Sequence, residues 1–195
     1  MNLIKNFRHF LAITLLVLIT SIYSSDIFSK VFKNKSGSYE FEGDGQIQGW
    51  KLYKNTLGFD YFYAIESKEK KLSTLSIVIT GKKIELVPKA MKEKISDYKT
   101  NKEKWAKKKN ININHFNEYT FYENKKGIRF HKIGLSYSTS YLPNIKEVSY
   151  YVNCKDSSLL LIKYLLLPEH QERESHIIDF LHSMKSCQIH LNSNP

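Results

Sequence analysis

Proline, glycine and cysteine are scarce in this chain: its 195 residues include four Pro, eight Gly and two Cys. Collagen-like chains and disordered chains rich in Pro and Gly need far more of the first two residues, so these classes are excluded. Disorder of the whole chain is also excluded, because 13 Tyr and 11 Phe accompany enough Ile, Leu and Val to bury a core. The length fits a single domain.

Arginine is also rare, although the chain is basic. Arg8, Arg129 and Arg173 are the only arginines among 30 basic residues, which outnumber 19 acidic residues and give a net charge of +11. The planar guanidinium of arginine holds phosphate better than the lysine ammonium does, so we do not expect nucleic acid as a partner. The lysine excess suits solubility or loose attraction to anionic surfaces.

The start of the chain contains no acidic residue before Asp26 and has the layout of a secretory signal peptide. Lys5 and Arg8 precede an apolar run of about 13 residues, which is shorter than the ~20 residues of a bilayer-spanning helix. We therefore expect export with removal of residues 1–24, and an uncleaved N-terminal anchor is the alternative. Lipid attachment is excluded, because the first cysteine is Cys154.

The exported protein would reside in the periplasm of a Gram-negative bacterium, or be secreted from another kind of cell. The rest of the chain is expected to contain an N-terminal arm at 25–37, one domain at 38–190 and a C-terminal tail at 191–195. Within the domain, short runs rich in Tyr, Phe, Ile and Val predict four strands before residue 82 and a hairpin around the turn at 124–127.

Two later runs predict strands that differ in their surroundings. The run 145–154 alternates, and it places Val148, Tyr150, Val152 and Cys154 on one face. The run 159–168 is almost entirely apolar, which predicts a central strand covered on both faces.

Two helices complete the predicted α+β fold. Pro88 stands at the start of the first, and apolar residues at helical spacing follow it: Met91, Ile95, Tyr98 and Trp105. Similar spacing over 172–185, including Met184, predicts a C-terminal helix. We expect an antiparallel sheet with the long mid-chain helix and the C-terminal helix packed on one face of it.

The mid-chain helix is strongly basic. Between Lys89 and Lys109, nine lysines accompany three acidic residues, for a net charge of +6. One interpretation is an ordinary solvated helix surface; the other is a docking face for an acidic partner or an anionic membrane surface. The lysines of this candidate face are Lys89, Lys92, Lys94, Lys99, Lys102, Lys104, Lys107 and Lys108.

Gly49 and Trp50 follow an early predicted strand, and the mid-chain helix, antiparallel strands and a terminal segment IIDFLHSMKSC come after them. This order resembles the Mog1/PsbP/DcrB-like α+β fold group over about residues 38–187. The resemblance implies a non-catalytic binding or accessory module. DcrB-type members are lipoproteins, whereas this chain lacks the required cysteine, and no functional residue can be carried over.

Catalytic motifs are missing from the sequence. The run Gly134 to Ser138 fails the G-x-S-x-G pattern at its last position, and carboxylates are scattered. His176, Asp179 and His182 share one helix face that could hold a metal ion, although a solvated surface needs the same residues. We expect no catalytic residues, no cofactor and no metal.

Aromatic residues gather on the predicted sheet, where they can fill the core or form a recognition face. The clearest residue-level prediction is a disulfide between Cys154 and Cys187, since an exported chain with two cysteines would pair them. A free pair, or a Cys-His metal site with His182 or His190, is the alternative.

We expect a non-enzymatic binding or accessory domain that acts on a protein partner in the cell envelope. An immunity or inhibitor protein that neutralises a toxin or hydrolase is one alternative. A peripheral protein that binds an anionic membrane surface through the Lys-rich helix is the other.

Overall fold

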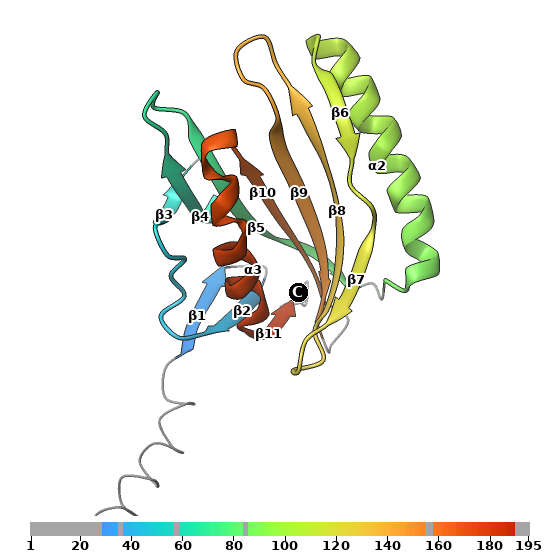
Figure 1. Ribbon diagram of the computed structural model, residues 1–195. Coiled ribbons are helices and arrows are strands. Elements are labelled where there is room, and N and C mark those ends of the chain that lie inside the picture. The colour runs from blue at the N-terminus through green and yellow to red at the C-terminus, as the bar shows by residue number, and fades with distance from the viewer. Residues whose placement is uncertain (1–28, 35–36, 57–58, 84–85, 155–157, 190–195) are drawn as a thin grey trace, which may run out of the picture.

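The computed structural model describes residues 29–34, 37–56, 59–83, 86–154 and 158–189. These residues form an α+β fold with two antiparallel sheets (Figure 1). The predicted signal peptide, residues 1–24, lies outside the described residues, as does the predicted tail at 191–195.

The larger sheet contains eight of the described strands. In spatial order these are β3 (Lys51–Thr56), β4 (Phe59–Glu66), β5 (Leu72–Lys83), β10 (Ser158–Leu166), β9 (Ile145–Asn153), β8 (Arg129–Ser138) and β6 (Asn112–Phe116), with β7 (Thr120–Glu123) also paired to β8. The apolar strand β10 lies between β5 and β9, which confirms its predicted central place. Four alternating residues were predicted to share one face, and all four are buried in one core cluster. Three of them lie in β9, namely Val148, Tyr150 and Val152, and Cys154 directly follows this strand.

The smaller sheet has the order β1 (Ser29–Asn34), β2 (Gly37–Glu42) and β11 (Met184–Ile189). Two of its strands differ from the sequence-based expectation. Part of the segment predicted as an N-terminal arm forms β1, because Phe32 is buried and stacks on Tyr39 of β2. Met184, predicted to continue the terminal helix, instead begins β11.

Helix α2 (Pro88–Lys109) is the predicted mid-chain helix, and its bounds follow from local chemistry. Pro88 occupies the first turn, where its missing N–H is harmless. Asn110 ends the helix in the left-handed conformation, with φ of 53°, and its N–H donates to carbonyls of the last turn. Three lysines in that last turn suit the negative end of the helix dipole.

The two helices cover opposite faces of the larger sheet, so the expectation that both lie on one face is wrong. Met91 of α2 packs with Ile133 and Leu159 on one face. On the other face lie a 3-10 turn, η1 (Pro168–Arg173), and the helix α3 (Glu174–His182) that follows it. Phe180 of α3 stacks on Phe41, with ring centres 4.0 Å apart. The sheet is buried on both faces because the central strands carry apolar residues on both.

A half-buried ion network holds the start of α3 on the sheet. The Glu174 carboxylate accepts a 2.5 Å hydrogen bond from the Tyr164 hydroxyl and pairs with Lys146 and, at 3.6 Å, with Lys132. Burial alone would raise the pKa of Glu174, but the hydrogen bonds from Lys146 and Tyr164 and the two lysine charges together lower it below its usual value. Glu174 is therefore charged at neutral pH and stabilises the folded state.

Candidate functional site

A groove with a volume of about 380 Å³ lies between α2 and the sheet. Strands β9 and β10 form its floor, and one side of α2 forms its wall. The residues that line it are Lys94, Asp97, Tyr98, Asn101, Lys102, Trp105, Ser149, Tyr151, Leu161 and Lys163. We call this feature the α2 groove.

A row of polar residues crosses three neighbouring strands, and two of them, Ser149 and Lys163, lie in the floor of the α2 groove. Lys163 of β10 is the direct cross-strand partner of Ser149 on β9 and of Ser76 on β5. Directly opposed residues on one face have Cβ atoms about 4.5–5.5 Å apart, so the lysine stands between two hydroxyl-bearing residues. The buried Ser149 hydroxyl has no hydrogen-bond partner among the described residues.

Lys163 itself is half-buried, and it forms no ion pair with any residue that the structure describes. Removing a charge from water costs free energy unless a partner compensates it. An unpaired cation in the floor of a groove therefore favours the binding of an anionic group there.

The wall of the groove combines cations with aromatic rings. Lys102 pairs with Glu147 of β9 at 2.6 Å, and its ammonium lies 4.7 Å from the centre of the Trp105 ring. Lys94 lies 5.8 Å from the centre of the Tyr151 ring. Contacts of this kind hold a lysine ammonium against a ring without neutralising its charge.

Both groove tyrosines remain neutral at physiological pH. Burial raises the pKa of Tyr98, and the negative charge of Glu147 raises it further. Burial also raises the pKa of Tyr151. Their rings therefore supply apolar surface with a neutral hydroxyl rather than a negative charge that would repel an anion.

The eight lysines of the predicted docking face differ in exposure. Lys89, Lys92, Lys99, Lys104, Lys107 and Lys108 are exposed, whereas Lys94 and Lys102 are half-buried and line the groove. Lys102 is engaged with Glu147, so it does not provide a free positive charge. Lys94 and Lys102 lie beside aromatic rings in the groove, and the exposed Lys99 lies 5.6 Å from the centre of the Phe116 ring outside it.

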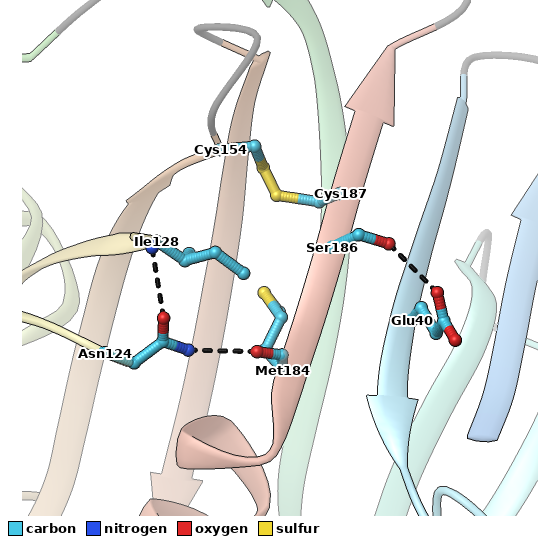
Figure 2. The surroundings of a disulfide bond; sticks show 7 residues. All are labelled: Glu40, Asn124, Ile128, Cys154, Met184, Ser186 and Cys187. Atoms are coloured by element: carbon cyan, nitrogen blue, oxygen red, sulfur yellow. Dashed lines mark hydrogen bonds between the residues drawn. A yellow bond between two sulfur atoms is a disulfide. The ribbon is translucent and has the colours of Figure 1, made fainter. Parts of the chain in front are cut away.

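Cys154 and Cys187 lie in the core cluster that also contains the buried residues of α3. Figure 2 shows the bond between their sulfurs. Their Cα atoms are 5.5 Å apart, which is the usual spacing for a disulfide, and their sulfurs are joined. Nearby, the Asn124 side chain donates a 2.9 Å hydrogen bond to the Met184 carbonyl at the start of β11 (Figure 2). Both contacts tie the smaller sheet to the larger one.

A serine hydroxyl and a histidine ring form a hydrogen-bonded pair inside the folded core. The fully buried Ser73 hydroxyl lies 2.8 Å from Nδ1 of His170 and accepts a hydrogen bond from the Leu167 N–H. It links β5 to the 3-10 turn, and a substrate could not reach it without opening the core. The pair therefore serves the fold.

A wider hollow of about 710 Å³ lies between the end of α3 and the turn that joins β7 to β8. Its lining mixes both charges, with Glu42, Glu123, Asp179, Lys125 and Lys126. Within the described ranges no three His, Cys, Asp or Glu side chains are placed to hold a metal ion. His176, Asp179 and His182 therefore do not form the metal site considered from their spacing.

The aromatic residues of strands β7 to β10 divide between core and surface. Phe130, Tyr137, Tyr150 and Tyr164 are buried in the core, whereas Phe121 is exposed and Tyr151 lines the α2 groove. Of the described helices, none is long and apolar enough to cross a bilayer.

Sequence reasoning missed the α2 groove, although one signal pointed to it. Lys163 interrupts the apolar run of β10, and a lone lysine in a central strand must face a polar site, an acid or solvent. The pairing of Lys163 with Ser149 depends on strand register, which the sequence alone does not provide.

No protein-family model matches the chain, and no curated protein matches its sequence. Among solved structures, the chain is similar to one described as the solution structure of cyanobacterial PsbP (CyanoP) from Synechocystis sp. PCC 6803. The match has a TM-score of 0.47 and 8% sequence identity, and it covers 82% of this chain and 92% of that chain.

Proposed function

We propose that this chain is an exported, non-catalytic binding domain that recognises a protein partner through the α2 groove. The observation that carries the proposal is the half-buried Lys163 in the groove floor, without an acidic partner among the described residues. An anionic group of a ligand can pair with this ammonium, whereas a neutral ligand that covered it would only remove it from water at a cost in free energy.

The rest of the groove supports binding rather than chemistry. Trp105, Tyr98 and Tyr151 supply rigid aromatic surface, the type of residue that contributes most of the free energy in protein interfaces. The groove lining contains no cysteine or histidine, and its one serine is not hydrogen-bonded to a base.

Export is supported by the cysteine pair. Paired cysteines persist in oxidising compartments, such as the periplasm or the cell exterior, and are rare in the cytosol. The N-terminal segment adds the sequence pattern of a signal peptide. A location in the cell envelope fits both the cysteine pair and the N-terminal segment.

Two narrower functions differ in how the partner would be held. An immunity or inhibitor protein would bind one toxin or hydrolase with nanomolar affinity. A membrane-surface protein would instead use the exposed lysines of α2, but Glu93 and Glu103 are exposed among them and reduce the local charge. The groove favours a protein partner over a membrane surface.

The proposal is tested by co-isolation from the envelope fraction of the native host. The wild-type protein should retain a single partner, and the double variant K94M/K163M should lose it. The matched control is K68M/K125M, which removes two exposed lysines outside the groove and should retain the partner. Equal retention by both double variants would contradict the proposal.

A further inference from the structure

We infer that the α2 groove receives a carboxylate from a short, extended acidic segment of the partner, with an apolar or aromatic residue of that segment lying against the groove wall. This inference rests on the proposed function and adds the chemistry of the ligand. It is carried by the row of donors in the floor, by the charge of the lining and by the length of the wall.

The floor offers donors suited to a carboxylate. Lys163 supplies an ammonium, and the adjacent Ser149 supplies a hydroxyl that no described residue engages. A carboxylate has two oxygens and about four acceptor sites, so it can accept from both side chains together. Hydrogen bonds between a charged donor and a charged acceptor are also about twice as strong as neutral ones.

The charge inventory favours an anion over a cation. Lys94, Lys102 and Lys163 line the groove, and Asp97 is the acidic residue in its lining. Glu147 compensates Lys102 from the strand beside it. Even when Glu147 is included, one positive charge remains in excess, and Tyr98 and Tyr151 stay neutral because burial raises the pKa of each hydroxyl.

The wall fits a peptide rather than a single small anion. Its residues run from Lys94 to Trp105, which at 1.5 Å per helical residue corresponds to about 16 Å. An extended chain rises about 3.3 Å per residue, so roughly five residues would follow the wall. Trp105 and Tyr98 lie along this length and would contact apolar side chains of the segment.

The test measures the fluorescence anisotropy of a labelled peptide, Ac-Glu-Phe-Glu-Phe-Glu-amide, mixed with the exported protein. We expect saturable binding that weakens at least tenfold in K163M and about threefold in S149A. The control variant K68M removes an exposed lysine in the turn before β5 and should bind within twofold of wild type. Urea unfolding of K163M should show no loss of stability, because the ammonium has no described ion partner to lose and its uncompensated charge costs free energy.

Two competing ligands make the inference falsifiable. The glutamine analogue, Ac-Gln-Phe-Gln-Phe-Gln-amide, should bind at least tenfold more weakly, and equal binding would overturn the role of the carboxylate. Phenylacetate should compete only at far higher concentration than the peptide. Competition at equal concentration would overturn the peptide in favour of a small-molecule anion.

The result separates this inference from the proposed function. If no acidic peptide binds while K94M/K163M still loses the host partner, the carboxylate inference is wrong and the binding function stands. If both double variants keep the partner, the binding function itself is wrong.

Discussion

Removal of the Cys154–Cys187 pair should destabilise the protein substantially. The two residues are 33 positions apart, and for a loop of this size the chain-entropy model gives about 3.5–4 kcal/mol. A domain is typically stable by about 5–15 kcal/mol, so the loss is a large share of the total. With a urea dependence of about 2 kcal/mol per molar, the unfolding midpoint should fall by about 2 M.

The structure also predicts where the loss appears first. Cys187 lies in β11, whose strand partner in the smaller sheet is β2, and Cys154 directly follows β9 of the larger sheet. Without the bond, β11 remains attached through the Asn124 hydrogen bond to Met184 and through core packing. Amide hydrogen exchange should therefore accelerate in β11 and β2 before it does in β9 and β10.

Urea unfolding of C154A/C187A, monitored by tryptophan fluorescence and circular dichroism, measures the effect. Reduction of the wild-type protein is the matched control, because it breaks the bond without altering side-chain volume. Both should lower the midpoint similarly. A variant as stable as wild type, or two free thiols per chain in the denatured, unreduced exported protein, would refute the reasoning.

Three other predictions concern charge and export. E174Q should lose about 1–2 kcal/mol at pH 7, less than for a fully buried pair because its partners are partly solvated. Since the pKa of Glu174 is lowered on folding, its stabilisation is present above the unfolded value near 4.5 and is lost as the pH falls through the folded value, so the two urea midpoints should converge as the pH is lowered from 4.5 through that folded value. Intact-mass measurement should show loss of about 24 residues from protein taken from the host, and full-length protein in the membrane fraction would favour an anchor. Vesicles with anionic lipid should retain the protein weakly at low salt and release it near physiological salt, whereas retention in high salt would indicate an apolar membrane contact.

Local patterns predicted the elements whose residues carry a strong periodicity. Pro88 and the apolar spacing up to Trp105 located α2, and the alternation around Val148 located β9. Both are long elements in which local sequence and burial agree. The same reasoning failed at Met184, because its spacing continues the helical pattern although the chain has already entered β11.

Sequence periodicity does not predict which elements of the fold pack against one another. An apolar stripe shows which side of a helix is buried, but it does not show which face of the sheet covers it, so α2 and α3 were placed together instead of on opposite faces. The binding groove depends on the same relations. Lys163 and Ser149 are 14 residues apart, and only their cross-strand pairing makes them neighbours.

The most direct test of the central claim is site-specific photocrosslinking in the native host. A photoreactive phenylalanine analogue would replace Asn101, an exposed residue on the α2 wall of the groove, or Glu172, an exposed control position in η1. The account predicts one discrete protein adduct from position 101 that disappears when K163M is added, and none from position 172. An adduct from position 172 alone, or one from position 101 that survives K163M, would contradict it.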